Sequence, residues 1–398
     1  MVTSSRLILV GALLAATIPA QSSTDPLSDV RKAAERGDAR AQEDLGGAYL
    51  VGRGVPKDAV EALKWYRMAA EQGLASAQSM MGTFYDSGTA VTMNAEDALK
   101  WYRKAAEQGD SYGEVGLGTF YSRREDVVEA ARWFRKSAEH GNASGQLKLG
   151  ASYEGGNGVP KDHSEAAKWY RMAADQGNAT AQSKLGEMYS DGQGVPQAYA
   201  EAIRWFRRAA DQGNATAQSR LASIYGSGQG VPKDYAEAAR WARKAADQGN
   251  ATSQFDIGEM YASGLGVPQD YAEAIRWLRK AADQGESRAQ LNLGIMYHTG
   301  QGVQKDYAQA IRWFRNAAEQ GNATAQSKLG VMYASGQGVP QDYAEAHMWM
   351  NLAASRATGD DQKKFADVRE LIAKNMTAQQ IAEAQRRARE WKPKQASK

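Results

Sequence analysis

Tryptophan recurs at a fixed interval, and this interval constrains the possible fold more than any other feature of the chain. Nine of the ten tryptophans are 36 residues apart, except for one gap of 32. They are Trp65, Trp101, Trp133, Trp169, Trp205, Trp241, Trp277, Trp313 and Trp349. Such a period is typical of stacked repeats that bury their apolar faces against one another. Aligning the chain with itself gives nine repeats over residues 39–358, which predicts an α-solenoid if the repeats are helical.

Each repeat contains two stretches in which apolar residues recur at helical spacing. In the repeat 179–214, Leu185 and Met188 lie on one arc of the first stretch, with a tyrosine that every repeat contains. We expect this tyrosine ring to fill a gap between helices. In the second stretch, Trp205 and Phe206 share one arc and charged residues occupy the other. The pattern predicts an all-α chain of nine helix-turn-helix repeats, whose first and second helices we call helix A and helix B.

Glycine and aspartate mark the connection between the two helices. A Gly-x-Gly turn, such as Gly192 and Gly194, ends helix A. A phosphate-binding loop is the alternative, but it requires a Gly-Lys-Ser/Thr sequence that does not follow here. Asp58 with Glu61 predicts a capping box on helix B, as do equivalent pairs in most repeats. The fifth repeat has Ala198 at the cap, so its helix B should begin less stably by ~1 kcal/mol.

Glycine also lies inside helix A in eight repeats, as at Gly186, and the sixth repeat has Ala222 there. Glycine in a helix costs about 1 kcal/mol relative to alanine, so we expect the backbone of a neighbouring helix to approach closely. Asparagines such as Asn178 follow helix B and predict an N-cap for the next helix A. They also match glycosylation sequons, an alternative that requires a host with that machinery.

The repeat resembles a known family. Its pattern, A-x-x-x-L-G-x-x-Y-x-x-G-x-G-V-x-x-D followed by A-x-x-W-x-x-x-A-A-x-x-G, is similar to the Sel1-like repeat, a relative of tetratricopeptide repeats. The resemblance covers residues 39–358 and implies a right-handed α-superhelix that acts as an adaptor or regulator, often in the bacterial periplasm. The third repeat departs from the pattern, because residues 122–128 lack the Gly-x-Gly turn and the repeat is four residues short.

The first twenty residues resemble an export signal. One positive charge precedes an apolar run of eleven residues that ends at Thr17, and a cleavage site follows Ala20. We therefore expect residues 1–20 to be a signal peptide and the protein to be periplasmic or secreted. An uncleaved anchor is the alternative, although eleven residues are too few to span a bilayer. After cleavage we expect no membrane span.

Terminal repeats need caps, because an open solenoid end exposes apolar surface. We expect residues 21–38 to form an N-terminal capping helix and residues 359–398 to form C-terminal capping helices and a tail. Phe365 and Leu371 mark one of these C-terminal helices, and Thr377 with Gln380 begins another.

Composition argues against several classes of function. Cysteine is absent and the four histidines occupy different repeat positions, so we expect no metal site and no cofactor. The net charge is +3, which does not indicate a nucleic-acid partner. Gly109 to Gly113 matches the Gly-x-Ser-x-Gly of hydrolases, but it falls between two predicted helices, and we expect no enzyme. The alternative is a weak hydrolase of the β-lactamase or cell-wall-active type, which the resemblance associates with a cysteine-rich branch.

The expected function is an exported scaffold or regulator that binds a partner protein or peptide in the cell envelope. Related repeats imply that helices A line the concave face, so variable residues there are the binding candidates. The apolar candidates are Leu50, Met80, Val115, Leu147, Phe255, Leu291, Ile295 and Val331. The charged candidates in the same region are Lys184, Glu187, Arg220, Asp256 and Lys328. The alternative is that these are scattered surface residues without a role.

An arginine also follows most tryptophans by two residues, as at Arg171 and Arg207. Asp175 and Asp211, four residues further on, can pair with these arginines on a solvated outer face. A second interpretation is a track that binds peptidoglycan or another polysaccharide.

Overall fold

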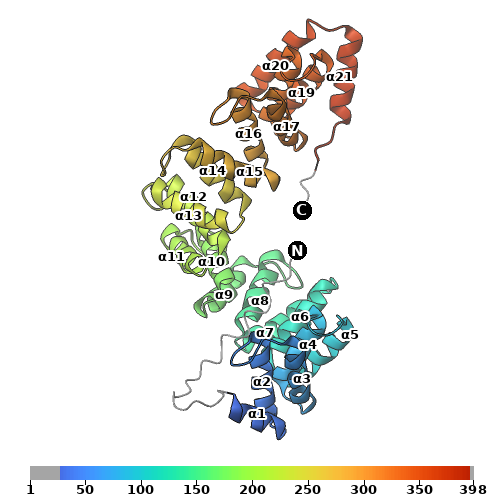
Figure 1. The fold of residues 1–398 in the computed structure, drawn as a ribbon, viewed down its shortest axis with the longest axis vertical. Coiled ribbons are helices and arrows are strands. Elements are labelled where there is room, and N and C mark those ends of the chain that lie inside the picture. Colours follow the sequence, from blue (N-terminus) through green and yellow to red (C-terminus); the bar gives the residue numbers. More distant parts are fainter. Residues whose placement is uncertain (1–26, 395–398) are drawn as a thin grey trace. The chain divides into compact units, whose positions relative to one another are not determined.

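The computed structural model describes residues 27–394, and over this range its regular elements are 21 helices. The predicted all-α chain of two-helix repeats is therefore confirmed. The predicted signal peptide lies outside the described residues. The helices form two compact units, an N-terminal unit that ends at Gln197 and a C-terminal unit that begins at Ala198 (Figure 1).

The N-terminal unit contains ten helices, in which even numbers from α2 on are helices A and odd numbers from α3 on are helices B. They are α1 (Ser28–Glu35), α2 (Ala39–Val51), α3 (Ala59–Glu71), α4 (Ala75–Ser87), α5 (Ala95–Glu107), α6 (Ser111–Arg123), α7 (Val127–Glu139), α8 (Ala143–Gly155), α9 (His163–Asp175) and α10 (Ala179–Asp191). Helices α1 to α9 each pack on the next helix along the chain. Helix α1 precedes the first repeat and packs on α2.

The C-terminal unit contains eleven helices and continues the same alternation. They are α11 (Tyr199–Asp211), α12 (Ala215–Ser227), α13 (Tyr235–Asp247), α14 (Ala251–Ser263), α15 (Tyr271–Asp283), α16 (Ser287–Thr299), α17 (Tyr307–Glu319), α18 (Ala323–Ser335), α19 (Tyr343–Arg356), α20 (Gly359–Ala373) and α21 (Ala378–Glu390). Helices α11 to α19 each pack on the next helix, and α21 packs on α19. The repeats in each unit are therefore consecutive helical hairpins.

Helix B buries one face in every hairpin because its apolar residues share one arc. In α9, Ala166, Tyr170 and Ala173 are fully buried. In α11, Trp205 and Phe206 are buried in the same way. Each buried aromatic ring contributes about 2 kcal/mol or more, and the contributions accumulate along a stack of similar repeats.

A side chain of helix B covers the glycine inside helix A. A Cβ atom added at Gly82 would lie 2.5 Å from Cδ1 of Tyr102, and one at Gly118 would lie 2.4 Å from Cε1 of Phe134. The predicted close approach is present, but a ring makes the closest contact, whereas we expected the backbone. In the sixth repeat both positions are alanines, Ala222 and Ala242, and both are buried. The larger residue on helix A is therefore matched by a smaller residue on helix B.

Where it is present, the Gly-x-Gly turn attaches a repeat to the preceding one. Gly192 is the left-handed C-cap of α10, with φ of 69°. Gly194 also has a positive φ, 70°, and a Cβ atom added there would lie 2.1 Å from the His163 carbonyl oxygen. His163 is the first residue of the preceding helix B, α9. The second glycine thus meets two requirements at once, a left-handed backbone and close contact with the neighbouring repeat.

The predicted aspartate N-caps of helices B are present, but most of them are not full capping boxes. The Asp58 carboxylate accepts from the Val60 and Glu61 backbone N–H groups at 2.9 and 3.1 Å. The Asp58 N–H, which a capping box would give to Glu61, donates instead to the Tyr49 carbonyl at 2.9 Å. The capping-box prediction was therefore wrong at this helix, because the end of helix A already uses that N–H group. The side chain of Ala198 caps nothing, as predicted.

Two other cap predictions are confirmed in full. Asn178 accepts from the Ala181 N–H at 3.0 Å and begins α10. Thr377 and Gln380 form a complete capping box at the start of α21.

In the shortened third repeat, α6 and α7 keep thirteen residues each, so the missing residues come from the turn alone. That turn passes through Glu125 in a left-handed conformation, with φ of 63°.

The turn contact predicts unequal costs for two glycine-to-alanine substitutions in the N-terminal unit. Gly177→Ala should cost only ~1–2 kcal/mol, because Gly177 has a positive φ but nothing within 4 Å of an added Cβ atom. Gly194→Ala carries the same backbone cost and must also displace the His163 carbonyl, so we expect at least ~3 kcal/mol in total. Thermal unfolding followed by circular dichroism measures both, and equal midpoints would contradict the attachment.

Candidate functional site

A row of glutamine pairs forms hydrogen bonds inside the repeats. Sequence analysis did not single out these glutamines. Gln254 of α14 is buried, and its amide donates to the Ala246 carbonyl at the end of the preceding helix B at 3.1 Å. Its carbonyl accepts from Gln284 of its own helix B at 2.7 Å. The row satisfies carbonyls that helix ends leave open. In the third repeat Glu114 and His140 replace the pair, with 2.9 Å between Oε2 and Nδ1.

The arginines that follow tryptophan are occupied in a similar way. Arg243 donates to the Tyr261 hydroxyl at 2.9 Å, from helix B of one repeat to helix A of the next. The same bond forms at all eight such arginines: Arg67, Arg103, Arg135, Arg171, Arg207, Arg243, Arg279 and Arg315. Arg243 also pairs with Asp247 four residues on, at 3.5 Å. The row therefore joins successive repeats, and the constant offset of 18 residues to the tyrosine was its signal in the sequence.

The structure separates the predicted apolar candidates into three groups. Leu50, Met80 and Phe255 are buried, with 8%, 7% and 8% of their surface exposed, so they pack inside the stack and offer little surface to a partner. The half-buried candidates are Val115, Leu147, Leu291 and Ile295. Val331 on α18 is 45% exposed. Exposed apolar surface among the candidates is thus concentrated on the last repeat.

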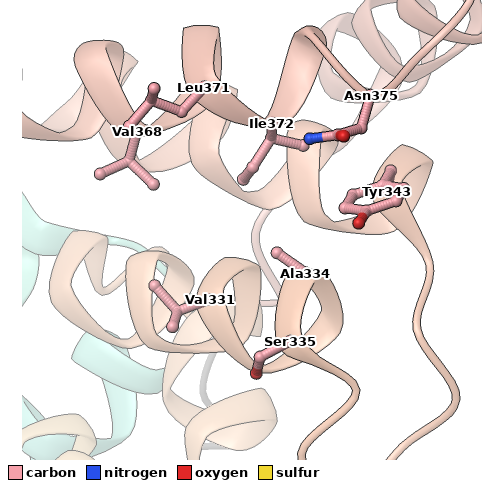
Figure 2. A pocket seen from close by; sticks show the side chains of 8 residues that line it. All are labelled: Val331, Ala334, Ser335, Tyr343, Val368, Leu371, Ile372 and Asn375. Atoms are coloured by element: carbon pink, nitrogen blue, oxygen red, sulfur yellow. The ribbon is translucent and has the colours of Figure 1, made fainter.

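Val331 lies at an open apolar pocket of about 330 Å³ in the C-terminal unit (Figure 2). Helices α18 and α20 line its two sides, and Tyr343 at the start of α19 closes one end. The lining residues are Val331, Ala334, Ser335, Tyr343, Val368, Leu371, Ile372 and Asn375. Leu371 is 57% exposed. Sequence analysis assigned Leu371 to a C-terminal capping helix and did not include it among the binding candidates, so its place in the pocket was missed.

Helix α20 takes the place of a further helix A, which explains the pocket. Arg369 donates to the side-chain amide oxygen Oδ1 of Asn351 on α19 at 2.9 Å, with the same offset of 18 residues as each arginine–tyrosine bond. Here the donor lies on α20 and the acceptor on α19, whereas in the arginine–tyrosine bonds helix B donates to the next helix A. In this register Val368 takes the place of Met332 and Leu371 that of Ser335, one helical turn beyond the place equivalent to Val331. We call Ile295, Val331 and Leu371 the apolar row, because they lie on successive helices α16, α18 and α20.

One charged candidate, Asp256, lies on α14 together with a second carboxylate, Glu259, that was not a candidate. Asp256 is largely buried, and burial raises the pKa of its carboxyl group to about 6, with further contributions from Glu286 and Glu259 that Arg288 opposes. Burial also raises the pKa of Glu259. The guanidinium of Arg288 is 2.8 Å from Glu286 and lies 4.3 Å from the centre of the Phe255 ring. This part of the surface thus concentrates carboxylates whose charge is only partly balanced.

The remaining charged candidates are placed less favourably for a single site. Lys184 forms ion pairs with Glu154 at 3.5 Å and Glu187 at 3.3 Å in the N-terminal unit. Arg220 and Lys328 are exposed on α12 and α18. A smaller pocket of about 200 Å³ lies at the shortened third repeat, where Phe134 and Lys148 contribute to its lining.

The residues considered for catalysis lie at a junction between helices. Ser111 is the first residue of α6, and its hydroxyl accepts from Asn142 at 3.1 Å. Across residues 27–394 no group of three histidine or acidic side chains is placed to hold a metal ion. None of the helices in the described part of the chain could span a membrane.

Comparisons with known proteins identify the repeats. A family model described as Sel1 repeat matches residues 39–74, 75–110, 112–142, 143–178, 179–214, 215–250, 251–286, 287–322 and 323–357. The crystal structure of a protective antigen of uropathogenic Escherichia coli with an SLR fold is 35% identical, with a TM-score of 0.55 over 91% of this chain and 85% of that one. A Sel1 repeat protein from Oxalobacter formigenes is 37% identical, with a TM-score of 0.56 over 61% of this chain and all of that one. No curated protein matches.

The raised pKa of Asp256 predicts a pH-dependent effect of its removal. Between the model-compound value of 3.8 and about 6 the folded state binds more protons than the unfolded state, so the folded protein gains stability as the pH falls through this range. Asp256→Asn should therefore raise the unfolding free energy by on the order of 1–3 kcal/mol at pH 7.5, and by little at pH 4. Calorimetric midpoints at both pH values measure this. Asp283→Asn, at an exposed carboxylate of α15, is the control, and an equal gain for it would contradict the assignment.

Proposed function

Because the chain belongs to the Sel1 repeat family, we propose that it is a protein-interaction scaffold whose C-terminal unit binds a partner protein through the apolar row. The observation that carries this proposal is the exposure of Val331 and Leu371, 45% and 57%, at the rim of one pocket. Large apolar side chains that remain exposed together mark interaction sites more often than isolated ones do.

The size and chemistry of the pocket suit a protein partner. Its volume of about 330 Å³ and its apolar lining suit an apolar side chain that inserts between α18 and α20. Anchoring side chains of this kind contribute most of the binding energy at many interfaces. Rows of exposed residues on successive helices A provide a surface on which a longer segment can lie.

Two alternative functions receive less support from the residues involved. A hydrolase would need a general base hydrogen-bonded to the Ser111 hydroxyl, but among the described residues this hydroxyl is bonded to the Asn142 amide and not to a histidine. A polysaccharide track would use the arginines that follow tryptophan, but each of these donates to a tyrosine of the next repeat, as Arg243 does to Tyr261. We therefore favour a scaffold without catalytic activity.

We also propose that the protein is exported, on the basis of the apolar run that ends at Thr17. Mass spectrometry of the mature protein should find Gln21 as its first residue. Leu13→Arg interrupts the run and should leave the uncleaved chain in the cytoplasm, whereas Ser5→Arg, before the run, should not. Recovery of mature Leu13→Arg protein outside the cytoplasm would contradict export by this signal.

Site-specific photo-crosslinking tests the proposed binding surface. A benzoylphenylalanine residue at position 331 or 371 of the full chain should crosslink one predominant protein in the native cell, and mass spectrometry identifies it. Placing the same residue at Val60, which is 63% exposed on α3, provides a matched control. Leu371→Asp should lower the crosslink yield from position 331 at least tenfold, because it introduces a charge into the apolar pocket. The same products at positions 331 and 60 would contradict the proposal.

A further inference from the structure

Two carboxylates on α14 lie beside the apolar row and share a single cation, Arg288, with Glu286. Asp256 and Glu259 are three residues apart on one helix, so their side chains share a face. The Asn292 amide of α16 donates to the Glu259 carboxylate. Asn292 and Ile295 are also three residues apart, so Glu259 meets α16 within one helical turn of the apolar row.

The cation nearest to these carboxylates is already occupied. Arg288 is the only positive group that acts appreciably on Asp256 among the described residues. Its guanidinium is bonded to Glu286 at 2.8 Å and lies over the Phe255 ring at 4.3 Å. Three carboxylates thus surround one arginine, which leaves a local excess of negative charge.

The neighbouring helices supply no further cation to this place. The bond from Asn292 to Glu259 sets the register between successive helices A. Lys328 lies on α18, two helices A further along the chain than Glu259. Arg220 of α12 makes no appreciable contribution to the charge environment of Asp256. Helices α12 and α16 contribute one arginine each and no carboxylate, so the excess negative charge is confined to Asp256, Glu259 and Glu286.

We propose that the segment bound by the apolar row carries a lysine or arginine beside its apolar residues, and that Asp256 and Glu259 bind this basic side chain. This inference rests on the proposed function and specifies the chemistry of its partner. A guanidinium or ammonium group supplies the charge that this surface lacks. The aliphatic stem of the same side chain can extend along the surface toward Ile295.

The partial burial of Asp256 makes this recognition stronger than a contact between fully exposed charges. Exposed ion pairs contribute little, whereas a carboxylate already removed from water pairs more favourably with an incoming cation. Because the pKa of Asp256 is about 6, binding of a basic segment should weaken as the pH falls below that value.

Selection from a displayed library of random 12-residue peptides on the purified mature protein tests both levels of the proposal. We expect the enriched peptides to contain a lysine or arginine next to apolar residues. Synthetic versions of the strongest binder, with its basic residue intact or replaced by glutamine, are then measured by fluorescence anisotropy. The replacement should weaken binding at least tenfold to the unchanged protein and less than twofold to the double variant Asp256→Asn, Glu259→Gln.

Separate variants distinguish the failure of this inference from the failure of the proposed function. Val331→Asp should abolish peptide binding and Val60→Asp should leave it unchanged. Peptides that need Val331 but show no basic enrichment, or that bind equally to the double variant, would overturn the basic segment and leave the scaffold function standing. Peptide binding that Val331→Asp leaves unchanged would overturn the proposed function itself. Circular dichroism of each variant checks that it is folded.

Discussion

The close approach of helix A and helix B at one glycine is the constraint on which each hairpin depends. A side chain of helix B, a ring in most repeats, lies close to where a Cβ atom of helix A would be, as Tyr102 does at Gly82. Packing of this density tolerates little change of volume on either side. The sixth repeat shows the compensation, since Ala222 on helix A is accompanied by Ala242 on helix B. In this hairpin a larger residue on helix A is therefore matched by a smaller residue on helix B.

Once the hairpins form, polar side chains join them into a stack. The glutamine pairs satisfy carbonyl groups at the ends of helices B, and the arginines bind tyrosine hydroxyls of the next repeat. Buried polar groups are expensive unless they are bonded, so these rows make correct stacking more favourable than incorrect stacking. They also occupy the arginines that could otherwise attract anionic ligands. Residues available for recognition are then the variable ones on helices A.

The candidate site arises where the repetition is interrupted. Helix α20 occupies the place of another helix A, but the bond between Arg369 and Asn351 is reversed and no Gly-x-Gly turn follows. Leu371 and Val331 consequently remain exposed on either side of a pocket. Asp256 and Glu259 add a charged neighbour two repeats earlier. Departure from the repeat gives the C-terminal unit a surface that identical repeats would not provide.

Local sequence determined the repeat number, the helical hairpins and most of the caps, because these depend on residues within one repeat. The cap at Asn178 and the missing cap at Ala198 were both predictable in this way. Exposure was not predictable, because it depends on which neighbouring helix covers a residue. Phe255 and Val331 were both apolar binding candidates in the sequence, yet Phe255 is buried beneath Arg288 and Val331 faces an open pocket. Only the packing of successive helices decided which candidates form a surface.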